Sequence, residues 1–332
     1  MSNYKNILGG LLAAAVGDAM GAATETRNTD QIKERFGGFV MDFIAPPDDV
    51  FARGFKRGSV TDDFSLAYYT AMAIINHKGI INNTTAHAAL INWSKTPYYK
   101  LAGPTTCAAI NRILGKEDSD SDVFKPAYDN LKGTNGGAMK IAPVGLASGG
   151  NIDKAIKDAI TICKPTHNNS TALSGACAVA AAVAEALNEN ATIDSMVEAG
   201  LKGALEGEKH GIQLANPSVY KRILLAVNIA KRCKDDIVNT MQELSDLIGC
   251  GLSAAEAVPT AFGLLVASDG DVEKAVIAAV NIGNDTDTIA TIAGAMSGTL
   301  SGYYNKRQLD LINQVNRFDL EYIADKLVHL YE

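Results

Sequence analysis

Apolar residues recur every three or four positions along most of the chain, which is the spacing of one buried face of an α-helix. Alternation of apolar and polar residues is nearly absent, and β-branched runs between turn signals are scarce. The pattern therefore predicts an all-α fold. The helices that it predicts cover residues 62–78, 84–95, 137–148, 152–163, 170–188, 192–206, 217–232, 252–268, 271–281, 286–300 and 318–331.

These helices are expected to form a single compact domain that spans residues 1–332. No long stretch rich in Pro, Ser and Gly divides the sequence, as a linker between two domains would. Residues 37–60, 115–136 and 207–216 are predicted to be loops, long enough to frame a site. The acidic run 117–122 is expected to be solvated, because it lacks the central glycine and distal glutamate of a calcium loop.

The first apolar run, Ile7 to Gly17, follows Lys5 and so resembles a secretory signal, but Asp18 interrupts it. The run is too short to span about 30 Å of hydrocarbon, which takes roughly 20 apolar residues. Its Ala and Gly content is typical of a close-packed helix, so a buried core helix is preferred to a cleaved signal. The Ala-rich segment 173–187 is also too short for a membrane span and is predicted to be a central core helix.

The composition of the 332-residue chain narrows its expected partners. Hydrophobic residues make up 47% of the sequence, which is ample for a substantial core. A net charge of −7 supplies no basic field for nucleic acid or an anionic membrane, so small molecules or cations are expected instead. The five cysteines form no CxxC pair, which indicates neither a disulfide framework nor a zinc site and favours a reducing cytoplasm.

Two clusters of carboxylate and hydroxyl side chains stand where helices are predicted to begin. They are Thr61, Asp62 and Asp63 in the first cluster and Asp285, Asp287 and Thr288 in the second. One explanation is helix capping, which is worth about 1 kcal/mol for each residue. The other is a divalent cation, because these oxygens suit Mg²⁺, Mn²⁺ or Ca²⁺ and crowded carboxylates repel one another without one. The residues alone leave both explanations open.

Three further features are ordinary when each is taken alone. Glu25 is a solvated charge at a helix end. The segment Asn135-Gly136-Gly137-Ala138-Met139 is a loop entry, although its glycines would let backbone N–H groups approach a phosphate at a helix start. His167, at another helix start, is a capping or hydrogen-bonding histidine.

Five segments together resemble the signature segments of the ADP-ribosylglycohydrolase family, in the family's order and over most of the chain. They are GDAMGAATE (17–25), GSVTDDFSLA (58–67), NGGAMKIAPVGL (135–146), THNNSTALSGACA (166–178) and GNDTDTIATIAGAMSGTLSG (283–302). The resemblance implies a single all-α domain with a cleft floored by two divalent cations, Mg²⁺ or Mn²⁺. The metal ligands that it implies are Thr61, Asp62, Asp63, Asp285, Asp287 and Thr288.

The resemblance also implies a role for each of the three features that are ordinary when taken alone. It implies that Glu25 orients or deprotonates the attacking water, a role suited to a carboxylate beside a metal-bound water. It implies that His167 lies beside the phosphates and ribose of the substrate. The loop that it places along the pyrophosphate of ADP-ribose contains Asn135, Gly136, Gly137 and Met139.

The activity that the resemblance implies is metal-dependent cleavage of a glycosidic bond at the anomeric carbon of ADP-ribose or a related ribosyl conjugate. The conjugate is expected to be a small molecule or linked to a protein. The alternatives are nucleosidase-like hydrolysis of a smaller N-ribosyl ligand and non-catalytic binding of ADP-ribose. Loss of activity is expected to show as missing ligands, and all six metal positions and Glu25 are present. The sequence does not indicate the oligomeric state.

Two places depart from the family pattern. Many relatives that hydrolyse ADP-ribosylarginine carry an acidic residue before the Thr-rich turn at 105–106, whereas this chain has no carboxylate in residues 101–106. Some relatives place an aromatic ring against the adenine, near the position of Leu252 here. We therefore expect weak activity on ADP-ribosylarginine and better activity on another ribosyl conjugate.

Overall fold

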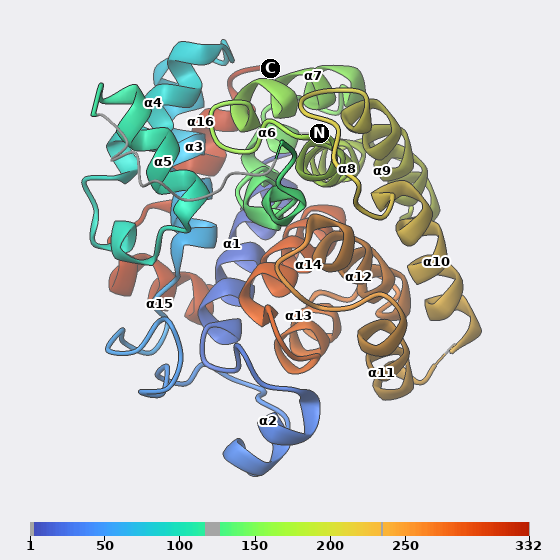
Figure 1. Cartoon of the computed structure of the whole chain (residues 1–332). Coiled ribbons are helices and arrows are strands. Elements are labelled where there is room, and N and C mark those ends of the chain that lie inside the picture. The colour runs from blue at the N-terminus through green and yellow to red at the C-terminus, as the bar shows by residue number, and fades with distance from the viewer. Residues whose placement is uncertain (1–2, 117–126, 234, 332) are drawn as a thin grey trace.

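The regular structure of the chain is helical (Figure 1). A computed structural model describes residues 3–116, 127–233 and 235–331. Within these ranges there are sixteen α-helices, three short 3-10 helices and three isolated β-bridges, without any strand. The α-helices are α1 (Tyr4–Gly21), α2 (Thr29–Phe36), α3 (Asp62–Asn76), α4 (Asn83–Trp93), α5 (Pro104–Ile113), α6 (Ala142–Leu146), α7 (Ile152–Cys163), α8 (Ser170–Glu185), α9 (Ile193–Glu208), α10 (Val219–Arg232), α11 (Ile237–Leu247), α12 (Ala254–Ala267), α13 (Val272–Asn281), α14 (Thr286–Ser301), α15 (Lys306–Asn316) and α16 (Leu320–Val328). The 3-10 helices are η1 (Pro97–Leu101), η2 (Asn130–Lys132) and η3 (Asn135–Gly137).

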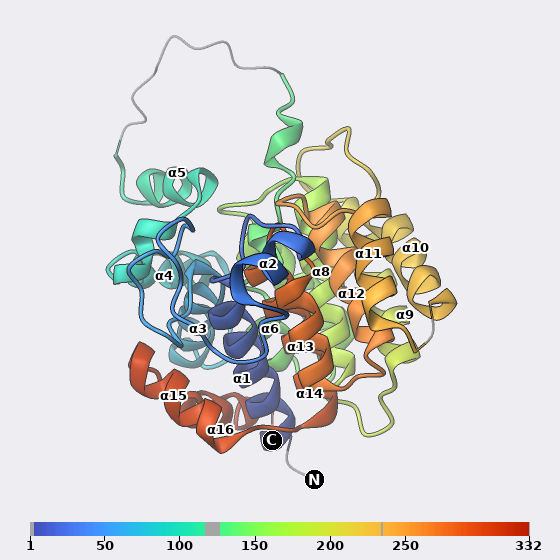
Figure 2. The same ribbon diagram turned by 90° about the horizontal axis from the view of Figure 1, so that it is seen from below.

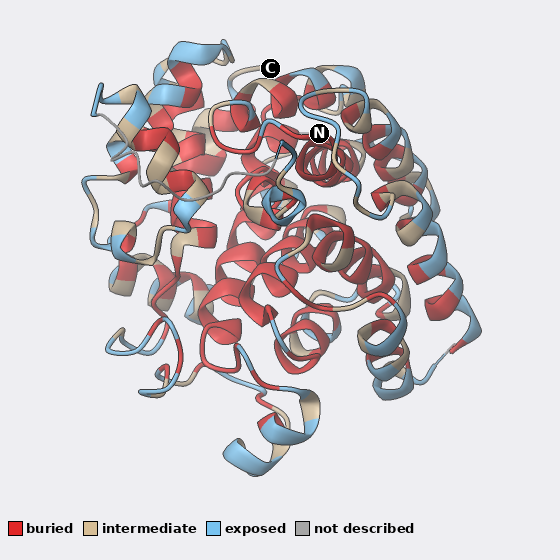
Figure 3. Cartoon of the chain, viewed as in Figure 1, coloured by how far each residue is buried: buried red, intermediate tan, exposed pale blue. Residues whose placement is uncertain are grey.

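Two helices rich in small residues, α1 and α14, pack against each other in the centre of the molecule (Figure 1). Glycine lets their backbones approach closely. A Cβ on Gly17 would lie 2.3 Å from the carbonyl oxygen of Ala290, and one on Gly294 would lie 2.4 Å from that of Ala13. Residues 7–21 are all buried, which confirms the predicted core helix in this part of the sequence. Figure 3 shows α1, α14 and α8 buried over most of their lengths.

The other helices surround this pair in a single all-α domain. Helix α8 packs against α7 and α9, α12 packs against α10 and α14, and α3 packs against α4. In Figure 2, α3 and α15 lie on one side of α1 and α13 and α14 lie on the other. The buried apolar side chains of these helices form one continuous cluster. None of the helices in the described ranges has both the length and the apolar character that crossing a membrane requires.

Most helices that the apolar pattern predicts are confirmed, and α7 has the predicted bounds. The helix predicted over 137–148 is wrong in extent, because only Ala142–Leu146 is α-helical and a 3-10 turn precedes it. Pro143 fits the beginning of α6, since proline lacks an N–H group and is best tolerated in the first helical turn, where that group would have no partner within the helix. The segment 135–139 is therefore a turn, several residues before a short helix, and does not itself begin a long one.

The pattern missed α2, α5, α11 and α15. These helices turn a narrow face to the core: α2 buries only Ile32, so its apolar spacing is hard to detect. The predicted loop at 37–60 contains no regular element, whereas α9 continues to Glu208 and so enters the loop predicted at 207–216. The acidic run 117–122 lies outside the described residues.

Candidate functional site

A cleft of about 720 Å³ opens where the beginnings of α3 and α14 converge on the end of α1. Its walls include the segments 51–53, 100–106 and 134–136. The predicted loop at 37–60 therefore does frame the site through its residues 51–53. The floor carries the side chains of Glu25, Thr61, Asp62, Asp63, Asp285, Asp287 and Thr288.

Asp18 holds the beginning of α3 in place. Its buried carboxylate accepts hydrogen bonds from the backbone N–H groups of Thr61, at 2.9 Å, and Phe64, at 2.8 Å. Thr61 is the N-cap of α3, and its hydroxyl accepts a bond from the N–H of Asp63 at 3.2 Å. In the sequence, Asp18 interrupts an apolar run and belongs to the family segment at 17–25, but neither feature indicates this contact. The signal for its role was that it is the only charged residue in the buried stretch 7–21.

A pair of hydrogen-bonded loops brings Glu25 to the beginning of α14. The N–H of Thr26 donates to the carbonyl of Asn284 at 2.8 Å, and the N–H of Asn284 donates to the carbonyl of Arg27 at 2.7 Å. The close approach of α1 and α14 continues here, since a Cβ on Gly21 would lie 2.5 Å from the Cα of Asp287. Glu25 therefore faces the first turn of α14.

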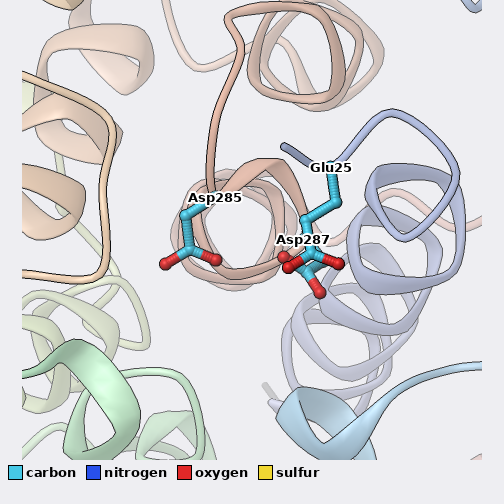
Figure 4. Close-up of side chains that lie close together, drawn as sticks. All are labelled: Glu25, Asp285 and Asp287. Atoms are coloured by element: carbon cyan, nitrogen blue, oxygen red, sulfur yellow. The ribbon is translucent and has the colours of Figure 1, made fainter. Parts of the chain in front are cut away.

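Three buried carboxylates lie together at this point (Figure 4). Glu25, Asp285 and Asp287 each offer one oxygen, and these oxygens lie within 4.8 Å of one another. Asn135 donates a short hydrogen bond from its side-chain amide to Asp285. The spacing would let all three carboxylates approach a single cation.

The cluster of α3 adjoins this triad. The hydroxyl of Thr288 donates to the carboxylate of Asp63 at 2.7 Å, which joins the beginning of α14 to that of α3. Asp62 stands beside it in the first turn of α3 and is partly exposed to the cleft. The two clusters that the sequence separates by more than two hundred residues thus form one acidic floor.

Burial and mutual repulsion raise the pKa values of these acids. Burial, followed by the nearby charges of Asp285 and Asp62, raises the pKa of Glu25 to about 8. Burial and the neighbouring Asp18 raise the pKa of Asp62 to about 7. The pKa values of Asp63 and Asp287 are also raised well above the usual range, chiefly by burial. A divalent cation would offset this repulsion, and oxygen donors of this kind fit Mg²⁺ or Mn²⁺.

Capping explains only part of this arrangement. Thr61 caps α3, as that explanation expects. Asp285, however, occupies the N-cap position of α14 without making a side-chain capping bond, and it accepts from Asn135 instead. Capping therefore does not account for the carboxylate of Asp285, which belongs to a group of three carboxylates that could hold a cation.

The remaining predicted positions lie on the wall of the cleft, with one exception. Asn135, Gly136, Met139 and His167 line the cleft. Gly137 is buried and is not among the lining residues, because it packs inward, where a Cβ would lie 3.3 Å from Sγ of Cys163.

The space beside Gly136 is taken by a protein side chain. A Cβ on Gly136 would lie 2.8 Å from Nε2 of His167, so the glycine makes room for the imidazole ring. The sequence predicts that glycine here makes room for a phosphate, and it gives no sign of this contact with His167. His167 precedes α8 and is buried, with 3% of its surface exposed.

The two departures from the family pattern both lie on the cleft wall. Residues 101–106 line it, and so does Leu252, which is 64% exposed. The exposed Arg53 and Lys100, which belong to none of the family segments, also line it. The wall is therefore cationic and apolar where the floor is acidic.

Comparison with known proteins places the chain in a family. Residues 1–332 match the ADP-ribosylglycohydrolase family, and the chain belongs to that family. The resemblance found in the signature segments is thereby confirmed.

Individual relatives are distant. The chain is 29% identical over 322 residues to a protein of Escherichia coli (strain K12) described as "Uncharacterized protein YegU", with 94% of each chain covered. It is 26% identical over 330 residues to the ADP-ribosylhydrolase ARH3 of Bos taurus, covering 93% of this chain and 87% of that protein. A solved "ADP-ribosylglycohydrolase-related protein complex" superposes with a TM-score of 0.68 at 20% identity, covering 100% of this chain and 99% of the other, which supports the fold.

Proposed function

We propose that this protein is a divalent-metal-dependent hydrolase that cleaves the glycosidic bond at the anomeric carbon of an ADP-ribosyl conjugate. The observation that carries the proposal is the buried triad of Glu25, Asp285 and Asp287 on the floor of a cleft of about 720 Å³. A cleft of this volume falls in the range of small-molecule sites. Membership of the family and the similarity to ARH3 support ADP-ribose as the ligand.

The proposed cofactors are two Mg²⁺ or Mn²⁺ ions. When bound, such ions supply Lewis-acid polarisation and lower the pKa of water to the neutral range. Asp18 and Asn135 would keep the ligands of the ions in position, because they hold α3 and Asp285 respectively. The residues proposed to hold the ions are Thr61, Asp62, Asp63, Asp285, Asp287 and Thr288.

Glu25 lies close enough to Asp285 and Asp287 to reach a cation, but it is proposed to act on the attacking water and not as a main ligand of the ions. Its carboxylate orients that water toward the anomeric carbon and accepts its proton as the water adds. The bond from the anomeric carbon to the leaving group breaks, and positive charge develops on the ribose. The acidic floor stabilises this oxocarbenium-like charge electrostatically. The leaving group departs with the bonding electron pair and takes up a proton. The products, ADP-ribose and the released partner of the conjugate, thus together contain the atoms of one added water.

The wall of the cleft is proposed to bind the rest of the substrate. Asn135, Gly136, Met139 and His167 border the phosphates and ribose, with Gly137 supporting the turn from behind. Residues 101–106 offer no carboxylate for a guanidinium group, and Leu252 offers apolar contact without an aromatic face for adenine. We therefore propose a conjugate other than ADP-ribosylarginine as the preferred substrate.

A hydrolysis screen tests the proposal. The panel contains ADP-ribosylarginine, ADP-ribosylserine and simple nucleosides, each with Mg²⁺ and with EDTA. The expected result is hydrolysis of an ADP-ribosyl conjugate that EDTA abolishes, with ADP-ribosylarginine not the best substrate. Preferential hydrolysis of nucleosides would favour a nucleosidase, and binding of ADP-ribose without any hydrolysis would favour a non-catalytic binder.

A further inference from the structure

Lys140 is a buried cation directly behind the cleft wall. It follows Met139 in the chain, and 1% of its surface is exposed. Among the described residues it forms no ion pair with a carboxylate, and its ammonium group donates to Oγ1 of Thr166 at 2.9 Å. Fully buried lysines without an acidic partner are rare, because desolvating the charge is unfavourable. The position of this lysine therefore calls for a reason other than stability.

Thr166 connects this lysine to the cleft. Its Oγ1 lies 2.8 Å from Nδ1 of His167 and 3.3 Å from the carbonyl oxygen of Cys163. A threonine hydroxyl has one hydrogen to donate, and a lysine ammonium can only donate. Thr166 Oγ1 therefore accepts a hydrogen bond from Lys140. Its own hydrogen is donated either to Nδ1 of His167 or to the carbonyl oxygen of Cys163.

The opposite nitrogen of the imidazole lies at the cleft wall. Nε2 of His167 is the atom that a Cβ on Gly136 would approach, at 2.8 Å. Both residues line the cleft. Nε2 carries either a hydrogen or a lone pair, depending on the tautomer. That group lies beside Gly136, on the wall of the cleft.

We propose that Lys140 is a positioning residue that sets the tautomer of His167. The hydroxyl of Thr166 donates to Nδ1, so Nε2 carries the hydrogen and donates it to an anionic oxygen of the ligand. The ammonium of Lys140 favours this tautomer, because it attracts the lone pair of the imidazole and repels an N–H group on that side. The 2.8 Å separation from Nδ1, against 3.3 Å to Cys163, agrees with it.

The same surroundings keep His167 uncharged. Burial first, and then the charge of Lys140, lower the pKa of His167 to about 3. A neutral imidazole carries one ring hydrogen, so the choice of tautomer decides whether the cleft meets a donor or an acceptor. A phosphate oxygen requires a donor. The inference rests on the proposed function insofar as a phosphate of ADP-ribose is that ligand.

Nitrogen NMR of the ligand-free protein tests the tautomer directly. In ¹⁵N-labelled wild-type protein at neutral pH, Nε2 of His167 is expected to be protonated and Nδ1 unprotonated. Lys140→Met should increase the population with hydrogen on Nδ1. Hydrogen on Nδ1 in the wild type, or no change in Lys140→Met, would overturn the proposal. Neither outcome depends on hydrolysis, so the result is separate from the fate of the proposed function.

Binding and stability measurements add a second test. Lys140→Met should weaken ADP-ribose binding by about tenfold or more, the order expected for losing a hydrogen bond to a charged group. It should also leave the melting temperature unchanged or raise it, since it removes a buried charge. Lys154→Met on α7, which removes a lysine paired with Asp158, is the matched control and should bind normally.

Conservative variants separate positioning from packing. Thr166→Ser keeps the hydroxyl and should preserve both the tautomer and binding, whereas Thr166→Val should lose both. Equal binding by Lys140→Met and wild type would contradict the inference. Failure of the wild type to bind ADP-ribose would instead contradict the proposed function, and the tautomer measurement would still stand.

Discussion

At the scale of single residues, the proposed activity depends on carboxylates that the fold buries close together. Glu25, Asp285 and Asp287 are buried, although carboxylates are usually exposed. From the sequence, helix capping and a cation site explain Asp285 and Asp287 equally well. The structure favours a cation site, because the side chain of Asp285 makes no capping hydrogen bond at the N-cap of α14. Individual substitutions can therefore test each role.

The role of Glu25 predicts a catalytic defect without a binding defect. Glu25→Gln should lower kcat by roughly 10² or more, since the amide cannot accept a proton from water. Binding of ADP-ribose, measured by calorimetry, should remain within about threefold of wild type, because the shape of the side chain is kept. A kcat near that of wild type would remove Glu25 from the mechanism.

The proposed ligands predict a loss of cation binding without a loss of fold. Asp62→Ala and Asp287→Ala should each abolish measurable Mg²⁺ or Mn²⁺ binding in a calorimetric titration, while the helical circular dichroism stays unchanged. Asp153→Ala, which removes an exposed carboxylate of α7, is the control and should bind as wild type does. Unchanged affinity in both cluster variants would restore capping as the explanation.

At the scale of elements, α1 positions the floor of the cleft through its contacts with α3 and α14. Asp18 holds the beginning of α3, and Gly21 allows the backbone of α14 to approach. Asp18 and Gly21 therefore help to set the geometry of the acidic floor, although neither of them lines the cleft.

The close approach at Gly21 predicts a defect in both stability and cation binding. Gly21→Ala should reduce the free energy of unfolding by about 1–3 kcal/mol, because the new methyl group would lie 2.5 Å from backbone atoms of Asp287. Divalent-cation affinity should fall with it. Gly175→Ala in α8 is the matched control, since its methyl group would lie 3.1 Å from the nearest side-chain atom and 3.8 Å from the nearest backbone atom, the carbonyl oxygen of Ala254. Equal stabilities of the two variants, measured by denaturant titration, would contradict this account of the contact.

The sequence predicted a helix well when its buried apolar face was broad and poorly when that face was narrow. Helices with broad apolar faces, such as α7, could be located, whereas α2, which buries only Ile32, could not. The cleft residues could be proposed because family motifs carried them. The supporting contacts of Asp18 with α3 and of His167 with Gly136 could not be foreseen, because they join residues far apart in the sequence and depend on packing.

At the scale of the whole molecule, the acidic floor links stability to pH and to cations. Each of these carboxyl groups has a higher pKa in the folded protein than its ordinary value, so the folded state binds more protons than the unfolded state between the two values. Below the pKa of the unfolded state, these acids are protonated in both states and do not destabilise the fold. As the pH rises toward the pKa of the folded state, their ionisation lowers the free energy of unfolding. For Glu25 this window runs from 4.5 to about 8.

The linkage predicts a pH dependence that a cation removes. In EDTA, the melting temperature should fall as the pH rises from about 5 to about 8, because the acids of the floor ionise without a counter-charge. Saturating Mg²⁺ should raise the melting temperature and flatten this dependence, since binding to the folded state stabilises it. A melting temperature that is insensitive to Mg²⁺ at pH 8 would contradict a cation site on this floor.

Release of ADP-ribose from an ADP-ribosyl conjugate, measured as Mg²⁺ or Mn²⁺ is titrated into EDTA-treated protein, shows whether the protein is a metal-dependent hydrolase. We predict no release in EDTA, release that rises with the cation and then saturates, and none at any concentration for Asp287→Ala. Full activity in EDTA, or cation-dependent activity retained by Asp287→Ala, would contradict a metal-dependent hydrolase built on this acidic floor.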